Sequence, residues 1–246
     1  MKTAFVDEVF SSVQGEGPRL GERHIFVRFQ GCHIRCRFCD TPAALQPKGA
    51  VCRPQRSLVS FEREAVDNPM TAQQLSELCA RLVVPGRSRQ VLSLTGGEPL
   101  LQRDFLSAWL PRMRPLFRIY LETNGILFEA LQQVVDLIDV VSMDIKLPSA
   151  TGLHPFWEEH RKFLAACRGK ECFVKAVVTG DTSEADIITA AGIIAGVDPS
   201  ISLILQPATG NAAPEPALLL AFQETAMGIL NDVRVIPQVH LMLQVP

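Results

Sequence analysis

Three cysteines fall within eight residues of one another in the segment GCHIRCRFCDT (31–41). Cys32, Cys36 and Cys39 have the spacing C-x3-C-x2-C. A structural zinc site normally closes with four ligands, and a ferredoxin-type iron–sulfur cluster takes four thiolates. Three thiolates on one loop can hold a cubic iron–sulfur cluster at three corners and leave its fourth iron open to a small molecule. The alternatives are a zinc site completed by His33 and three thiols without a shared ligand.

Polar residues stand in or directly after several apolar, strand-like runs. Side chains alternate between faces along a strand, so Ser142, Asp144 and Lys146 of SMDIK share one face. Polar side chains at the carboxyl ends of several strands are what the active site of a barrel requires. The other residues of this kind are Arg28, Thr95, Glu122, Thr123 and Gln206.

The segment TGGEP (95–99) directly follows one of these runs. Its two glycines allow the backbone to approach a ligand closely. Exposed backbone amide units there can bind a carboxylate or an ammonium partner. A plain turn is the alternative interpretation.

The elements that must position these residues alternate between short β-branched runs and helical ones. This alternation predicts a parallel sheet with right-handed crossovers. Six or seven such units are too few for a closed eightfold barrel, so we expect an α/β fold with an open, partial barrel in a single domain, 1–246. Strands are predicted at 24–29, 91–95, 117–123, 139–145, 172–179 and 201–205, helices at 71–83, 128–137, 155–167, 184–195 and 216–230, one more helix beginning near 101, and a last strand or extended tail at 233–240.

One stretch, 42–70, interrupts the alternation with several prolines and basic residues. A structureless connection of that length is unusual in a compact domain. We interpret it as an insertion containing a short helix or hairpin, which serves as a lid, a partner surface or a tolerated surface addition.

Composition sets further limits. The chain is 47% hydrophobic with a net charge of −2, which gives no electrostatic case for nucleic-acid binding. No apolar run reaches membrane-spanning length, and Asp7 and Glu8 stand where a signal peptide would be apolar. We therefore expect a cytoplasmic protein whose seven cysteines are reduced. Cys52, Cys79, Cys167 and Cys172 are interpreted as core fillers or incidental thiols.

The spacing C-x3-C-x2-C resembles the signature of the radical S-adenosyl-L-methionine (SAM) superfamily. The resemblance implies a radical SAM core, a partial (β/α)6-type TIM barrel. It also implies a 4Fe-4S cluster on the three cysteines, whose open iron binds the amino and carboxylate groups of SAM. One electron then splits SAM into methionine and a 5′-deoxyadenosyl radical. In this superfamily a GGEP-like stretch contacts the methionine amino group, and Gly96, Gly97 and Glu98 match it.

Motifs along nearly the whole chain resemble the 7-carboxy-7-deazaguanine synthase family. These are VQGEG, FVRFQGC, CDT, TGGEP, ETNG, SMDIK, LQPATG and the tail PQVHLMLQVP. His33 and Phe38 depart from the asparagine and tryptophan common at those positions in the family.

The resemblance assigns roles to the matching residues. The cysteines would hold the cluster, and Thr41 would ligate Mg²⁺. The chain ends six residues after His240, so the resemblance makes His240 and the terminal carboxylate of Pro246 substrate contacts. The expected SAM contacts are Gly97, Glu122, Asp144, Ile145, Lys146, Gln206, Pro207, Ala208 and Thr209, and the expected substrate contacts are Val13, Gln14, Gly15, Arg28, Thr95, His240 and Pro246.

The implied reaction is a ring contraction. The adenosyl radical removes a hydrogen atom from C6 of 6-carboxy-5,6,7,8-tetrahydropterin, ammonia is lost, 7-carboxy-7-deazaguanine forms, and SAM is regenerated. This step belongs to queuosine-type deazapurine biosynthesis. The expected partners are a reductase such as flavodoxin or ferredoxin and a second copy of the chain in a homodimer. Two alternatives stay open: another radical SAM enzyme, such as a glycyl-radical-activating enzyme acting on a protein, and a non-catalytic metal-binding module.

Overall fold

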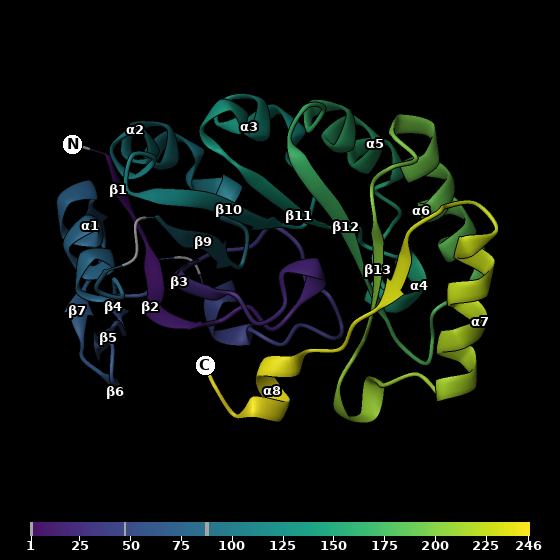
Figure 1. Cartoon of the computed structure of the whole chain (residues 1–246), viewed down its shortest axis with the longest axis horizontal. Coiled ribbons are helices and arrows are strands. Elements are labelled where there is room, and N and C mark those ends of the chain that lie inside the picture. Colours follow the sequence, from purple (N-terminus) through teal and green to yellow (C-terminus); the bar gives the residue numbers. More distant parts are fainter. Residues whose placement is uncertain (1, 47, 87–88) are drawn as a thin grey trace.

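An eight-stranded sheet forms the centre of the computed structural model, which describes residues 2–46, 48–86 and 89–246 (Figure 1). Every neighbouring pair of its strands is parallel except β2 and β3, which are antiparallel. Because β2 and β14 are its two edges, the sheet is open, and the predicted partial α/β barrel is confirmed. From one edge to the other the strands are β2 (Val6–Val13), β3 (Arg23–Phe29), β9 (Gln90–Gly96), β10 (Phe117–Thr123), β11 (Val140–Asp144), β12 (Glu171–Val178), β13 (Leu203–Pro207) and β14 (Val233–Val235).

Helices follow the parallel strands and cover the outer side of the curved sheet (Figure 1). The main apolar core lies between these two layers, with Leu92, Leu121 and Val141 among its fully buried members. The predicted helix at 128–137 is wrong in length, because it ends at Gln132 and a short 3-10 turn follows. The helices are α1 (Ala72–Arg81), α2 (Arg103–Met113), α3 (Phe128–Gln132), α4 (Pro148–Thr151), α5 (Trp157–Ala166), α6 (Glu184–Val197), α7 (Pro216–Met227) and α8 (Val239–Leu243).

The insertion at 42–70 contains small antiparallel pairs of strands and lies beside the β2 edge; Pro47 within it lies outside the described residues. The buried amide of Gln55 accepts a hydrogen bond from the backbone of Ser11 in β2 at 2.8 Å. Cys52 and Met70 join the main core. These contacts support our proposal that the insertion belongs to one domain spanning 1–246. Its strands are β4 (Val51–Cys52), β5 (Gln55–Ser57), β6 (Ser60–Arg63), β7 (Val66–Asp67) and β8 (Met70–Thr71), the last of which pairs with β1 (Thr3–Ala4).

The tail predicted at 233–240 is a short strand followed by a helix, since β14 ends at Val235 and α8 begins at Val239. In the part of the chain that the structure describes, no helix combines the length and the apolar character needed to cross a bilayer.

Candidate active site

A cavity of about 740 Å³ opens at the carboxyl ends of the central strands. The cysteine loop, the Q-G-E-G turn and the C-terminal segment close around it. Most residues expected from the sequence to bind a ligand line this cavity. They are Val13, Gln14, Gly15, Arg28, Cys32, Cys36, Cys39, Thr41, Thr95, Gly97, Glu122, Asp144, Lys146, Gln206, Ala208, Thr209, His240 and Pro246.

Two expected contacts, Ile145 and Pro207, are not among the lining residues. Ile145 is 1% exposed and belongs to the apolar core, because its neighbours Asp144 and Lys146 take the cavity face and alternation turns Ile145 away.

Sheet register explains why residues distant in sequence meet. Arg28 is paired with Thr95, and Glu122 with Ser142. Asp144 is paired with Lys175 of β12. All of these side chains line the cavity. The carboxyl ends of parallel strands meet at one edge of a sheet, so each strand delivers its polar residues to the same place.

The three cysteines are partly exposed on the cavity wall, and none is in a disulfide. Burial raises the pKa of Cys36 to about 11 and also raises the pKa of Cys32. A bound cation would favour the thiolate forms of Cys32 and Cys36 by replacing their protons. Within the described ranges no three His, Cys, Asp or Glu side chains surround a point that would suit one metal ion. His33 is exposed and does not line the cavity, so its position gives no support to a zinc site completed by His33.

The glycine-rich segment packs directly on the cysteine loop. A Cβ on Gly97 would lie 2.2 Å from the carbonyl oxygen of Gly31, so only glycine fits there. The amide of Glu98 donates to the same carbonyl at 2.8 Å. This close approach holds the segment TGGEP against the cysteines.

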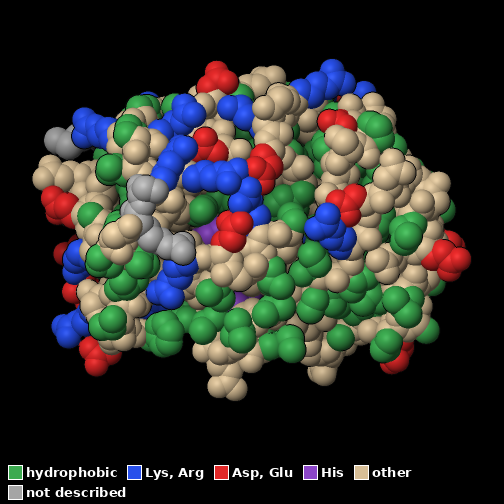
Figure 2. Space-filling model, in the orientation of Figure 1, with side chains coloured by type: hydrophobic (Ala, Val, Ile, Leu, Met, Phe, Trp, Pro, Cys, Tyr) green, Lys and Arg blue, Asp and Glu red, His purple; other side chains and the backbone are tan. Residues whose placement is uncertain are grey.

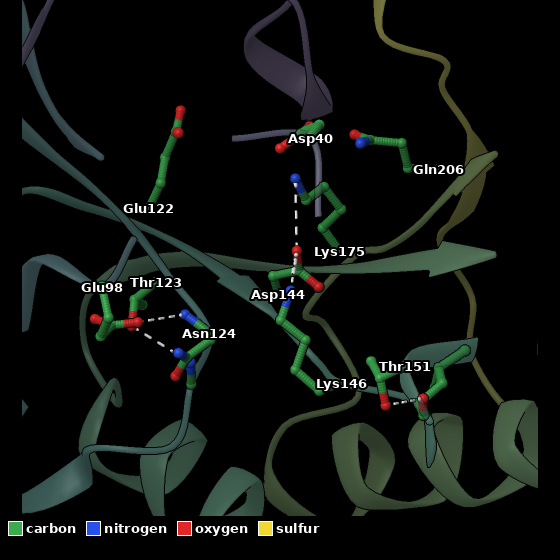
Figure 3. Close-up of polar contacts among 12 residues, drawn as sticks. Asp40, Glu98, Glu122, Thr123, Asn124, Asp144, Lys146, Thr151, Lys175 and Gln206 are labelled. Carbon is green, nitrogen blue, oxygen red and sulfur yellow. Dashed lines mark hydrogen bonds and ion pairs between the residues drawn. The ribbon is translucent and has the colours of Figure 1, made fainter. Parts of the chain in front are cut away.

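Glu98 links two of the segments that form the site. It is fully buried and outside the cavity lining. Its carboxylate accepts hydrogen bonds from Thr123 Oγ1 at 2.9 Å and from the amide of Asn124 at 2.9 Å (Figure 3). Burial raises its pKa to about 7, although these donated hydrogen bonds favour the ionised form. Glu98 therefore joins the TGGEP and ETNG segments.

A charged network crosses the cavity floor, and its centre, Lys175, was not predicted. Lys175 Nζ forms an ion pair with Glu16. It also lies 3.7 Å from Asp144 Oδ2, which Lys146 Nζ approaches to 2.8 Å (Figure 3). Burial raises the pKa of Glu16, but the Lys175 ammonium outweighs it and lowers that pKa to about 2. Burial lowers the pKa of Lys175, but the carboxylates of Glu16 and Asp144 raise it by more, so the net shift of the pKa is upward. Glu16 and Lys175 therefore favour their charged forms at neutral pH.

Amide side chains extend this network to the other walls. Gln238 Nε2 donates to Glu16 Oε1 at 2.7 Å and to Asp40 Oδ2 at 2.9 Å. Gln206 Nε2 lies 3.3 Å from Glu16 Oε1. Gln238 was also missed by sequence reasoning, because its partners are 222 and 198 residues away.

A second cluster surrounds Glu122. Its Oε1 accepts from Gln14 Nε2 at 2.9 Å, and its Oε2 accepts from Thr95 Oγ1 at 2.6 Å. Arg28 lies on the strand next to Thr95 and uses its Nε to bind Glu8 Oε1 at 2.7 Å. Because this pairing uses Nε, the terminal nitrogens of Arg28, which have no hydrogen bond to the residues that the structure describes, can bind an acid.

Two buried oxygens at the cavity have no hydrogen-bond partner among the described residues, Asp144 Oδ1 and Gln206 Oε1. Unpaired buried acceptors are costly, so both atoms suit a ligand that donates hydrogen bonds. A cofactor with an ammonium group and ribose hydroxyls, as SAM has, meets that requirement. The two unpaired oxygens thus fit SAM, and the three thiols fit a 4Fe-4S cluster.

Comparisons with known proteins agree with this chemistry. The profile described as "Radical SAM superfamily" matches residues 26–179. The 7-carboxy-7-deazaguanine synthase of Geobacter sulfurreducens is 41% identical over 246 aligned positions that cover 96% of each chain. The enzyme of the same name from Methanopyrus kandleri is 36% identical over 96% of this chain and 91% of the relative.

A solved structure supports the fold. The crystal structure of QueE from Escherichia coli superposes with a TM-score of 0.58 at 18% identity, covering 97% of this chain and 95% of that one. From the profile and the sequence relatives, the chain belongs to the radical SAM superfamily and, within it, to the 7-carboxy-7-deazaguanine synthase family.

Proposed function

We propose that this chain converts 6-carboxy-5,6,7,8-tetrahydropterin to 7-carboxy-7-deazaguanine, the product named in its relatives' names, with loss of ammonia. The observation that carries the proposal is the single cavity at which the three cysteines, the Asp144–Lys146 segment and the Arg28–Glu122 wall meet. A cofactor and a small substrate can therefore lie against each other in it.

The cofactor end of the cavity is the part nearest the cysteine loop. When bound, the cluster and SAM supply the one-electron chemistry that starts the reaction on the substrate. Cys32, Cys36 and Cys39 would hold the cluster, and Asp144 Oδ1 and Gln206 Oε1 would accept hydrogen bonds from SAM. Gly97, Lys146, Ala208 and Thr209 complete this end.

The substrate end is built around Glu122. We expected Glu122 among the SAM contacts, but its carboxylate is bonded to Gln14 and Thr95, which belong to the substrate set. An ionised carboxylate accepts hydrogen bonds, and the pyrimidine edge of a pterin presents N–H donors. We therefore assign Glu122 to the substrate, beside Val13, Gly15 and His240.

Thr41 would hold the magnesium ion. Thr41 Oγ1 is 3.2 Å from Asp40 Oδ1, and both residues line the cavity. Mg²⁺ prefers oxygen ligands and usually keeps several waters, so one threonine and the substrate's oxygens suffice. Asp40 adds negative charge beside that position.

The partners are proposed from the family and from the surface. An electron donor such as flavodoxin or ferredoxin must reduce the cluster, and a cytoplasmic location suits that donor. Apolar side chains gather over α7 and α8 (Figure 2), where Met242 is 75% exposed and Leu243 is 56% exposed. A patch of this kind supports a homodimer.

A glycyl-radical-activating enzyme would need an open groove for a protein, and the polar wall around Glu122 suits a small substrate instead.

The proposed function is tested by anaerobic incubation of reconstituted enzyme with SAM, reductant, Mg²⁺ and the carboxypterin. We expect the deazapurine and ammonia in equal amounts, read by mass spectrometry and an ammonia assay. Cleavage of SAM without any deazapurine would contradict the assigned substrate while leaving the superfamily chemistry in place.

Arg28→Ala is expected to weaken substrate binding while sparing the cleavage of SAM. Arg28 can form a charge-assisted fork with the pterin carboxylate, and losing such a pair costs a factor of about 10–100. Steady-state kinetics should show that loss as a higher KM for the carboxypterin.

Arg63→Ala is the matched control for Arg28→Ala. Arg63 also approaches Glu8, at 3.4 Å, and lies over the same Phe10 ring as Arg28, but it does not line the cavity. An equal rise in KM for both variants would show that Arg28 acts through its contacts with Glu8 and Phe10. It would contradict direct binding of the substrate carboxylate by Arg28.

A further inference from the structure

His160 lies on α5, behind the cavity, and does not line it. The side chain is fully buried, and both of its ring nitrogens have backbone partners. Nε2 accepts a hydrogen bond from the amide of Lys146 at 3.0 Å, and Nδ1 lies 3.0 Å from the carbonyl oxygen of Gly125. His160 thus bridges the segment after β10 and the segment after β11.

The two bonds require one form of the ring. An amide can only donate and a carbonyl can only accept, so Nδ1 carries the proton and Nε2 is bare. Burial, together with the nearby Lys146 ammonium, lowers the pKa of His160 to about 4, although the Gly125 carbonyl favours the charged form. The imidazole is therefore neutral at physiological pH and fixed in a single tautomer.

Both bridged segments face the cysteine loop. Asn124, next to Gly125, directs its side-chain amide at Cys32 Sγ across 4.0 Å. Lys146 Nζ lies 5.6 Å from the ring centre of Phe38, the residue before Cys39. His160 therefore contacts, from behind, two segments whose front sides touch the loop that carries the cluster.

Beyond the end of β11, a hydrogen bond to His160 replaces the hydrogen bonds between strands. The amide of Ile145 still donates to the carbonyl of Lys175 on β12 at 2.8 Å. The next amide, that of Lys146, finds its acceptor in His160. Gly125 has a left-handed φ of +68°, and a Cβ there would lie 2.6 Å from Met143 and 3.1 Å from His160 Nδ1, so the turn is packed tightly on the ring.

We propose that His160 is a positioning residue for SAM: its neutral ring sets the spacing between the Asn124–Gly125 turn and Lys146, and hence the shape of the cofactor end. The inference rests on the proposed function, because it assigns that end of the cavity to SAM. The substrate end around Glu122 has no contact with His160 among the hydrogen bonds described above.

Three substitutions separate the two bonds. His160→Phe removes both. His160→Asn places an amide nitrogen near the position of Nδ1 and keeps only the donor to Gly125, whereas His160→Gln places an acceptor near the position of Nε2 and can still bind the amide of Lys146.

The test measures SAM binding to the cluster-loaded enzyme by equilibrium dialysis, KM for the carboxypterin, and amide exchange of the peptide containing Lys146. We expect SAM binding to weaken about tenfold in His160→Asn, the effect of the one buried hydrogen bond to Lys146, and at least as much in His160→Phe, which loses both bonds. Exchange at Lys146 should speed up in the same two variants. His160→Gln should recover most of the affinity, and KM for the pterin should stay within about twofold of wild type because that end is separate.

Normal SAM binding by His160→Phe would overturn the inference alone. A parallel loss of SAM and pterin affinity in all three variants would also overturn it, since it would show general loosening. A wild-type enzyme that binds no SAM would instead overturn the proposed function, so the two failures are distinguishable.

Discussion

Cys36→Ala is expected to lose the iron–sulfur cluster and, with it, all formation of the deazapurine. The loop supplies only three thiolates to the cavity, so removing one leaves two, which is too few to anchor a cubane. Cys36 is partly exposed, so the fold should persist. Iron content and visible absorption after anaerobic reconstitution, together with product assays, measure the effect.

Cys172→Ala is the control for this substitution. Cys172 is also a partly exposed free thiol, on β12, but it does not line the cavity. It should retain wild-type iron content. If Cys36→Ala kept a full cluster, or if Cys172→Ala lost it equally, the assignment of the loop would be wrong.

Lys175→Met is expected to lower the free energy of unfolding by roughly 3–5 kcal/mol, because it removes the cation that the largely buried carboxylates of Glu16 and Asp144 share. Denaturant unfolding measures this loss. The double variant Glu16→Gln/Lys175→Met should recover much of it, since Lys146 still pairs with Asp144.

Lys162→Met makes the same chemical change at the surface. Lys162 is 50% exposed and pairs with Glu158 one helical turn away, so its loss should cost less than about 1 kcal/mol. Equal costs for Lys175→Met and Lys162→Met would contradict the role given to the buried network.

The same ion pair predicts a dependence on pH. The pKa of Glu16 falls from the ordinary 4.5 to about 2 in the folded chain. An acid whose pKa is lowered by folding stabilises the folded state above its unfolded pKa. For Glu16 that contribution is lost as the pH falls from 4.5 towards 2. In Glu16→Gln this part of the acid-induced loss should be absent.

The cysteine loop and the strand-end residues could be predicted because their information is local. The spacing of Cys32, Cys36 and Cys39 is read directly from eight residues. Alternation within a single strand correctly placed Ser142, Asp144 and Lys146 on one face, and all three line the cavity. The same rule, applied to Ile145, would have excluded it from the side-chain contacts.

The charged network could not be predicted with the same ease. Lys175 lies in the apolar run CFVKAVVT, and its partner Glu16 is 159 residues away. Only the register of β11 and β12 brings Asp144 beside Lys175. Alternation does place Lys175 on the same face as Val177, which lines the cavity, so a signal was present but its partners were not.

Burial also changed the meaning of one motif. The TGGEP segment matches a stretch that contacts the cofactor, but the carboxylate of its Glu98 accepts hydrogen bonds from the backbone and hydroxyl of the ETNG segment and from Leu100. His160, likewise, carried no local signal, because both of its partners are backbone groups on other elements.

The most direct test of the central claim is electron paramagnetic resonance of the anaerobically prepared, reduced enzyme with and without SAM. Three cysteines and an open corner predict the signal of a 4Fe-4S cluster, and that signal should change when SAM is added because SAM binds the free iron. A preparation without this cluster, or with a spectrum that SAM leaves unchanged, would contradict the mechanism.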